Sequence, residues 1–360
     1  MLQFLGNFEL DKDPITRQPK MATGSLGRVY FATDATATPP QHLAIKEVRL
    51  AALSDSQLRQ AKREPIILSA IRQKLAEVPD AANRQLLDKF VALHASHEVA
   101  ASMYLVMERM DGDLFDWLVP TQGLMMRQLD EATVAGIIFE VLVGLAVLHH
   151  NNIAHRDIKL ENVLYRKDPV TGNMTFKLTD FGLAKVITRG SDEDNTPCGT
   201  QMYIAPEVIA ACRMRKLGPE LQLDVKPTDM WSLGVMLYVM LIGKSITREA
   251  LARRAAHKML FDPSWCRRTV SDDAKDLVER LLDMDPTERD SVGDAGYHRF
   301  FARHGLDYGQ VHTALDKDGG PIQGAAAVVL APQTETFEML PENCDPAVDL
   351  AGTNQEPCSG

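Results

Sequence analysis

One short polar segment constrains the fold of this chain more than any other feature: His155-Arg156-Asp157-Ile158-Lys159-Leu160-Glu161-Asn162. It follows Leu129–His150, whose apolar residues recur on one broad face and predict a buried helix. The polar segment is therefore a loop at the end of that helix. A second motif, Asp180-Phe181-Gly182, follows the strand-like run Thr175–Leu178. The two motifs predict an acidic site built from two separate loops.

The first hundred residues have a different pattern. Short runs rich in β-branched and aromatic residues predict strands at Arg28–Thr33, Leu43–Val48 and Tyr104–Glu108. Between them, Ser54–Leu75 carries apolar residues at helical spacing. After residue 113 the pattern is mostly helical, with further helices at Met230–Gly243 and Ser271–Met284. We therefore expect an α+β fold with a small β-rich part and a larger helical part.

The order and spacing of four features are more specific than any one of them. They are the glycine-containing run Ala22–Val29, Lys46 on a strand, the His155–Asn162 loop and Asp180-Phe181-Gly182. Together they resemble the eukaryotic protein kinases over about 290 residues. The resemblance implies a bilobal kinase fold with an N-lobe at 8–110, which holds one main helix, and a C-lobe at 111–303.

The resemblance assigns the groups that would move the phosphoryl group. Asp157 would accept or orient the proton of the substrate hydroxyl, and Lys159 would neutralise charge on the phosphoryl group. Asn162 and Asp180 offer hard oxygen ligands for Mg²⁺. Lys46 would bind the α- and β-phosphates of ATP.

Glu64 matches the position of the helix glutamate that would hold Lys46 in place. It is followed by Pro65, which lacks an N–H and whose ring opposes the carbonyl of Ala61. We therefore predict that the helix kinks or begins again near Glu64.

The resemblance also implies an ATP-binding surface made of residues from several segments. In place of the first glycine of the phosphate-binding loop the chain has Ala22, whose methyl group is expected to weaken nucleotide binding, while Gly24 and Gly27 remain. Met107 would be the gatekeeper, and the Glu108 carbonyl and Met110 amide would read the adenine edge. For each residue singly, core packing explains the sequence equally well. The implied nucleotide-binding residues are Ala22, Gly24, Gly27, Val29, Ala44, Lys46, Met107, Glu108, Met110, Asp113 and Leu164.

Asp180–Glu207 corresponds to an activation loop of 28 residues. Thr196 lies where many kinases are phosphorylated, and an upstream activating kinase would add the phosphate. Arg156 is the expected partner of that phosphate, with Arg63 as a second candidate. An unmodified threonine is the plainer alternative.

Three structural roles follow from the same resemblance. Glu207 should pair with Arg289, and His155 should pack near Phe181. Asp229 should brace the His155–Asn162 loop, here called the catalytic loop, although an Asp ahead of an apolar helix is also typical of an N-cap.

Composition limits the partners. The chain has 39 basic and 49 acidic residues in 360, a formal charge of −10, which argues against nucleic-acid binding. Residues 305–360 contain nine acidic residues and one basic residue, so we expect 304–360 to be an acidic, mostly disordered tail.

The sequence also bears on the compartment. The five cysteines are scattered, which favours a reducing compartment. We see no signal peptide and no apolar run long enough to span a membrane, so we expect a cytoplasmic or nuclear protein without membrane contact.

Two functional readings from different classes remain open, with a third beside them. The first is a serine/threonine kinase that uses ATP and Mg²⁺, a branch favoured by Lys159 and by Gly199-Thr200. Its substrates would be proteins, with basic residues before the target hydroxyl read by Asp113 and Glu161. The run Cys198–Glu207 resembles the calcium/calmodulin-dependent group, but no basic amphipathic helix follows that would support calmodulin control.

The second reading is a pseudokinase or scaffold, supported by Ala22 and Pro65. A small-molecule kinase is disfavoured by the full-length activation loop.

Overall fold

The computed structural model describes residues 8–13, 15–23, 27–77, 85–99, 101–119, 126–127, 129–187, 202–215, 224–244, 246, 261 and 269–317. Contacts divide these residues into two compact units. The small unit contains the described residues up to Leu53 together with His94–Met107. The large unit contains Ser54–Leu93 and the described residues from Glu108 onward.

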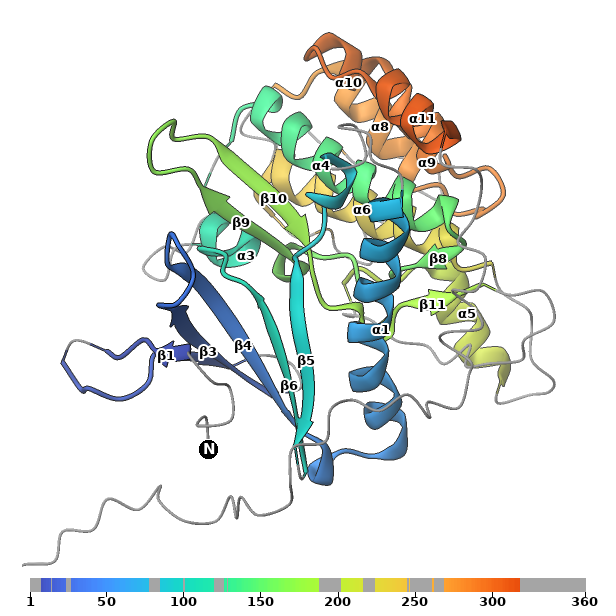
Figure 1. Ribbon diagram of the computed structural model, residues 1–360. Coiled ribbons are helices and arrows are strands. Elements are labelled where there is room, and N and C mark those ends of the chain that lie inside the picture. The colour runs from blue at the N-terminus through green and yellow to red at the C-terminus, as the bar shows by residue number, and fades with distance from the viewer. Residues whose placement is uncertain are drawn as a thin grey trace, which may run out of the picture. The chain divides into compact units, whose positions relative to one another are not determined.

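The small unit is an antiparallel-rich sheet of six strands. Its order is β1-β3-β4-β6-β5, and β2 pairs with the start of β3 (Figure 1). Alternate side chains of β3, β4 and β6, among them Tyr30, Ile45 and Val106, form one buried apolar cluster on a single face. All three predicted strands are confirmed. The strands are β1 (Phe8–Leu10), β2 (Met21–Thr23), β3 (Gly27–Asp34), β4 (Gln41–Arg49), β5 (Leu93–Val99) and β6 (Ser102–Glu108).

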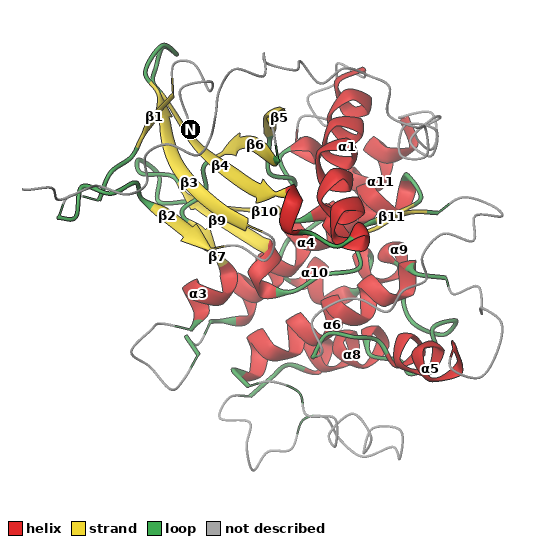
Figure 2. Cartoon of the chain, turned by 90° about the horizontal axis from the view of Figure 1, so that it is seen from below, coloured by secondary structure: helices red, strands yellow, loops and turns green. Residues whose placement is uncertain are grey.

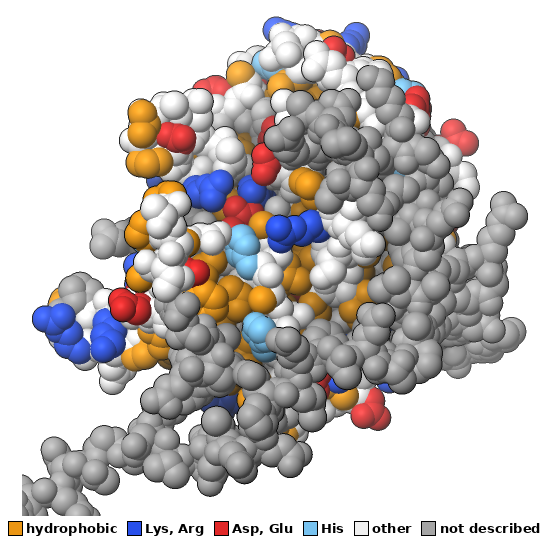
Figure 3. Space-filling view, in the orientation of Figure 1, with side chains coloured by type: hydrophobic (Ala, Val, Ile, Leu, Met, Phe, Trp, Pro, Cys, Tyr) orange, Lys and Arg blue, Asp and Glu red, His pale blue; other side chains and the backbone are white. Residues whose placement is uncertain are grey.

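The segment between β1 and β2 projects from this sheet as an exposed hairpin. Lys12 and Pro19 form an isolated antiparallel bridge, and Asp13 caps the turn by accepting the backbone N–H of Thr16 at 2.7 Å. Basic side chains are prominent on the projecting segment in the space-filling view (Figure 3). No motif in the sequence singles out this hairpin.

The large unit is built around two buried helices, α4 and α6. Both are apolar almost all round, and α6 packs between α4 and α8 (Figure 2). By length and composition α4 would also be able to cross a membrane, but most of it is buried inside the unit, as a core helix is. The principal helices are α1 (Asp55–Glu77), α3 (Leu114–Leu118), α4 (Glu131–His150), α5 (Pro206–Arg215), α6 (Lys226–Ile242), α8 (Asp272–Leu281), α9 (Val292–Gly296), α10 (Arg299–Arg303) and α11 (Tyr308–Lys317).

Short strands in the large unit carry the loops that matter below. Strands β9 (Val163–Lys167) and β10 (Met174–Leu178) form a hairpin, and β7 (Gly112–Asp113) pairs with β9. Strand β8 (Ile153–Ala154) pairs with β11 (Lys185–Val186). These pairs join segments that are far apart in the sequence.

Helix α1 differs from its prediction. It runs without interruption through Pro65, so the expected new start near Glu64 is wrong, and the alternative of a kink there stays a prediction. The burial of Ile67, Leu68 and Ile71 offsets the one helical hydrogen bond that proline cannot donate. The helix also groups with the large unit, because it packs on the short 3₁₀ turn η4 (Phe181–Leu183).

Two further predictions need correction. The predicted disordered tail begins with an ordered helix, α11, in which Tyr308, Ala314 and Leu315 are buried. Tyr308 fits against Gly296, where a Cβ would lie 2.4 Å from the tyrosine ring. Asp229 is not an N-cap, because α6 begins three residues earlier at Lys226.

Candidate active site

Strand pairing brings the two predicted metal ligands together. Val163 of β9 lies opposite Leu178 of β10, and the Thr179 N–H extends the ladder by donating to the Asn162 carbonyl at 3.1 Å. Asn162 and Asp180 therefore lie at the same end of this hairpin, although 18 residues separate them in the sequence. The register of one hairpin sets their proximity.

Asp157 is held beside Asn162 by side-chain hydrogen bonds. The Asn162 Nδ2 donates to Asp157 Oδ2 at 2.9 Å and to the Asp157 carbonyl at 2.7 Å. Lys159 Nζ donates to the same Oδ2 at 2.6 Å. The Asp157 carboxylate is buried and lies beside the cation of Lys159.

Asp229 of α6 fixes the backbone of the catalytic loop. Its carboxylate accepts the N–H of His155 at 2.8 Å, the N–H of Arg156 at 2.7 Å and Nε2 of His149 at 2.9 Å. Arg156 has a left-handed backbone with φ of 66°, which costs energy for a residue with a side chain. The predicted bracing role of Asp229 is confirmed.

The Asp180 segment is tied to the same loop through His155. The His155 ring lies 4.8 Å from the Phe181 ring, and its Nε2 lies 3.1 Å from the Thr179 carbonyl oxygen. Phe90, which precedes β5, packs on the other side of Phe181 at 6.0 Å. The predicted packing of the buried His155 ring near Phe181 is confirmed.

Asp180 has an unusual backbone, with φ of 60°. A non-glycine residue in the left-handed region is strained, and such residues concentrate at functional sites. Gly182 leaves room for the carboxylate, because a Cβ there would lie 3.3 Å from Asp180 Oδ1 and 3.5 Å from the Gln60 carbonyl of α1. Close packing on α1 therefore fixes the turn that presents Asp180.

These residues fit a bound Mg²⁺. The two N–H groups of Asn162 are used on Asp157, which leaves its Oδ1 as the end suited to a cation. Asp180 supplies a carboxylate on the adjacent segment. Among the described residues no three His, Cys, Asp or Glu side chains cluster as a protein-only metal site. One amide and one carboxylate match Mg²⁺, which commonly completes its shell with water and phosphate oxygens.

In the small unit, the predicted nucleotide residues share one face of the sheet. Val29 lies directly opposite Lys46, and Ala44 lies two residues before Lys46 on the same strand face. Met107 alternates with the buried Val106 of the apolar cluster and so belongs to the same face as Lys46. The register of β3 and β4 thus brings Val29, Ala44 and Lys46 together, and the neighbouring strand β6 adds Met107 to the same face.

The phosphate-binding segment is only partly described. Ala22 is on β2 opposite Val29, and Gly24 lies outside the described residues. A glycine is needed at position 27 for a structural reason, because a Cβ there would lie 1.8 Å from the Glu47 carbonyl oxygen of β4. A glycine at this position is required by the close approach of two backbones, whether or not a phosphate binds.

In the large unit, Asp113 and Leu164 are directly paired across β7 and β9. Asp113 also caps α3 by accepting the Asp116 N–H at 2.8 Å, and burial raises the pKa of its carboxyl above the usual range. Met110 is buried a few residues before it. Lys46 and Glu64 belong to different units, so their pairing stays a prediction.

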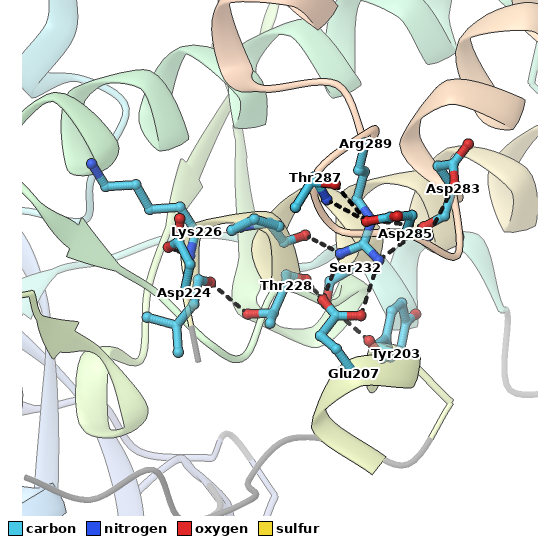
Figure 4. Close-up of polar contacts among 12 residues, drawn as sticks. Tyr203, Glu207, Asp224, Lys226, Thr228, Ser232, Asp283, Asp285, Thr287 and Arg289 are labelled. Carbon is cyan, nitrogen blue, oxygen red and sulfur yellow. Dashed lines mark hydrogen bonds and ion pairs between the residues drawn. The ribbon is translucent and has the colours of Figure 1, made fainter. Parts of the chain in front are cut away.

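The predicted pair of Glu207 and Arg289 is confirmed (Figure 4). Arg289 donates to both Glu207 oxygens, at 2.6 and 3.0 Å, and also to the carbonyls of Asp283 and Pro227. The fully buried guanidinium thus anchors the start of α5, just after the activation loop. Thr196 lies outside the described residues.

The structure adds residues that sequence reasoning missed. Lys177 of β10 and Arg166 of β9 both contact the carboxylate of Glu108. A lysine in the apolar run Thr175–Leu178 was the available signal, because a charged residue in a buried strand calls for a partner. Its partner, 69 residues away, is not evident from spacing.

Comparison with known proteins gives a consistent result. The model of the protein kinase domain matches residues 15–301. Serine/threonine-protein kinase PLK4 of Drosophila grimshawi is 33% identical over 214 residues, which cover 59% of this chain and 26% of the relative. The phosphorylase b kinase gamma catalytic chain, liver/testis isoform, of Bos taurus is 32% identical over 272 residues, covering 73% of this chain and 61% of the relative. Serine/threonine-protein kinase DCLK3 of Mus musculus is 36% identical over 208 residues, covering 55% and 24%. The chain therefore spans less than two thirds of these relatives.

Proposed function

The chain belongs to the protein kinase family, and on that premise we propose that it transfers the γ-phosphate of ATP to serine or threonine hydroxyls of proteins. The observation that carries the proposal is the junction of Asp157, Asn162 and the Thr179–Asp180 segment. A carboxylate, a cation and two hard oxygen ligands converge there, which are the groups that phosphoryl transfer requires.

Each residue at the junction has a distinct task. Asp157 accepts the proton of the attacking hydroxyl or orients that hydroxyl toward the phosphorus. Lys159, 2.6 Å from Asp157 Oδ2, offsets negative charge on the transferring group. Asn162 and Asp180 hold Mg²⁺, which neutralises charge on the phosphate oxygens when bound. Lys46 binds the α- and β-phosphates from the small unit.

The proposal is tested by phosphate transfer from labelled ATP to the protein itself and to an array of serine- and threonine-containing peptides. We expect incorporation that requires Mg²⁺, is abolished by EDTA and is lost in Asp180→Ala. Asp168→Asn, in the exposed turn between β9 and β10, is the matched control and should keep full activity.

The competing function is a scaffold that binds partners without catalysis. It is favoured by Ala22 in the phosphate-binding segment and by Pro65 inside α1. Equal background incorporation by the wild type and Asp180→Ala would support the scaffold and end the kinase proposal.

We also propose that the enzyme prefers basic residues before the target hydroxyl. Glu161 supports this preference, because its buried Oε2 has no hydrogen-bond partner among the described residues. The Glu161 charge lies close enough to Tyr203, next to the start of α5, to help raise the pKa of that tyrosine, and burial is the larger cause. On the peptide array, Glu161→Gln should lose preference for arginine over alanine before the target, with little change for peptides that lack arginine.

Regulation through Thr196 is a further part of the proposal. Arg156 directly precedes Asp157 in the catalytic loop. A phosphate on Thr196 that pairs with the Arg156 guanidinium would therefore act on the position of that loop. Treatment of the wild type with an activating kinase should raise activity, and Thr196→Ala should prevent that increase. Full activation of Thr196→Ala would remove this part of the proposal.

A further inference from the structure

Glu108, the last residue of β6, has a carboxylate that is almost fully buried and fully used. Its Oε1 accepts Nζ of Lys177 at 2.7 Å and the backbone N–H of Ala92 at 2.8 Å. Its Oε2 accepts Nη1 of Arg166 at 3.2 Å. One carboxylate is thus held by two cations and one backbone donor, all within the large unit.

This cluster is costly to bury. The Lys177 side chain is only 6% exposed, and its other carboxylate, Asp88, lies 3.6 Å away at the surface. A buried cation without a close partner is strongly disfavoured, so Lys177 depends mainly on Glu108. Replacing a buried ion pair by well-packed apolar residues of similar size is often neutral or even stabilising. Stability alone therefore does not account for a buried charge here.

The location of the cluster indicates what it does. The Glu108 N–H donates to the Ala92 carbonyl at 2.9 Å, and the Asp111 N–H donates to the Tyr165 carbonyl at 2.8 Å. Asp111 also accepts the Lys167 N–H at 2.8 Å. The backbone is thus held by hydrogen bonds on both sides of Arg109 and Met110. Both of the hydrogen bonds made by Asp111 are to residues of β9, in the β9–β10 hairpin.

The same hairpin carries Asn162 and the Thr179–Asp180 segment at its other end. It is therefore a common frame for the Glu108–Met110 backbone and for the predicted metal ligands. The Glu108 carboxylate joins that backbone to β9 through Arg166 and to β10 through Lys177.

We propose that Glu108, Lys177 and Arg166 form a positioning cluster that sets the adenine-reading backbone atoms, the Glu108 carbonyl and the Met110 N–H, relative to Asn162 and Asp180. The inference rests on the proposed nucleotide-binding function and deepens it. The three side chains do not touch the reacting atoms, so they act through the backbone that they hold.

The test is Glu108→Gln, measured by calorimetric binding of adenosine and of Mg²⁺–ADP and by steady-state kinetics. Glutamine retains an oxygen for the Ala92 N–H but removes the charge that pairs with both cations. We expect the affinities for adenosine and for Mg²⁺–ADP to fall by the same factor, about tenfold, with a matching rise in KM for ATP and kcat within about twofold. Equal loss for both ligands would show that the adenine contact has moved.

A second variant separates positioning from simple destabilisation. Adding Lys177→Met to Glu108→Gln removes the unpaired buried cation and should restore the unfolding midpoint, but not the adenosine affinity. Glu140→Gln, which breaks the ion pair of α4 with Lys89, is the matched control and should leave both affinities unchanged. If Glu108→Gln does not fold, Arg166→Gln takes its place, because that guanidinium is half exposed, and it should weaken adenosine binding about twofold.

The possible failures are distinguishable. Wild-type adenosine affinity in a destabilised Glu108→Gln, or in Arg166→Gln where that is the variant tested, would overturn the positioning role and leave the kinase proposal intact. A wild type that binds adenosine, loses affinity on Glu108→Gln, but transfers no phosphate would support the cluster and overturn the kinase proposal. A wild type that binds no adenosine would overturn the inference itself.

Discussion

The catalytic loop of the large unit and the Lys46 face of the small unit are held in place by different means. A single buried carboxylate, Asp229, fixes the loop by accepting three hydrogen bonds. The Lys46 face depends on the register of β3 and β4, a long ladder with eight residue pairs. The loop backbone at His155 and Arg156 therefore depends mainly on one side chain, whereas the sheet distributes its order over many backbone hydrogen bonds. We expect single substitutions to affect the two regions very differently.

The largest effect should come from Asp229→Asn. The change leaves His149 and two backbone N–H groups facing a neutral amide in a buried site, which should lower the unfolding free energy by about 3 kcal/mol. The loop would lose its bend at Arg156, so we expect kcat to fall at least about 100-fold. Urea unfolding and peptide phosphorylation measure the two effects.

Asp224→Asn is the matched control, since Asp224 is exposed and caps the Lys226 N–H. Equal, small effects of the two substitutions would contradict the dependence of the loop on one carboxylate.

A smaller effect is expected when the sheet is strained at its tightest point. In Gly27→Ala the new methyl group meets the Glu47 carbonyl, and β3 must move away from β4 at that end. We expect a loss of about 2 kcal/mol in unfolding free energy, because the rest of the ladder remains paired.

Gly136→Ala on α4 is the control for the same chemical change, because nothing lies within 4 Å of its added Cβ. It should stabilise the protein by about 0.5–1 kcal/mol. If Gly27→Ala lowers the unfolding free energy no more than an ordinary surface substitution does, β3 and β4 separate at that end without cost.

Ala22→Gly should change nucleotide binding more than stability. The exposed methyl on β2 lies at the start of the phosphate-binding segment, and its removal allows a closer approach to phosphate oxygens. We expect KM for ATP to fall about twofold and stability to change by less than about 1 kcal/mol. An unchanged KM would show that the first glycine of the family pattern is dispensable here.

The smallest effect concerns Asp276, an exposed counterpart of Asp229. Both carboxylates accept a histidine Nε2 at 2.9 Å, but Asp276 is partly exposed. The hydrogen bond from His298, with Arg280 nearby, lowers the pKa of Asp276 below its usual value of 3.8. The ionised form is therefore favoured in the folded state, so its stabilisation is present above about pH 4 and is lost as the pH falls through the lowered pKa.

Urea unfolding of Asp276→Asn at pH 6 and at pH 3 measures this contribution. The difference in midpoint from the wild type should be small at pH 6 and smaller still at pH 3. A difference that grows on acidification would contradict the direction of the pKa shift.

Much of the fold was predictable because its signals are local. Strand and helix periods located β3, β4, β6, α1, α4, α6 and α8, and the motif order gave the catalytic loop. Pro65 misled because local helix cost was weighed without the buried face that offsets it. Helix α11 was missed because the prediction relied on the acidic composition of the whole tail. Its few apolar residues are buried only in the tertiary structure, where Tyr308 packs against Gly296.

The candidate site was predictable as a set of residues but not as a geometry. Motifs named Asp157, Asn162 and Asp180, yet the contact between Asn162 and Thr179 follows from a strand register that no motif encodes. The cluster around Glu108 was not predicted at all, since it joins residues from three separate strands and Ala92, which directly precedes β5. Long-range pairing of buried charges depends on tertiary structure.

The most direct test of the central claim, that Asp157 and the Asn162–Asp180 end of the β9–β10 hairpin form one phosphoryl-transfer site, is kcat for peptide phosphorylation by Asp157→Asn with Mg²⁺–ADP affinity measured on the same sample. The account predicts a fall in kcat of about 10²–10⁴ with affinity unchanged within about twofold. Phosphate transfer by Asp157→Asn at the wild-type rate would contradict it.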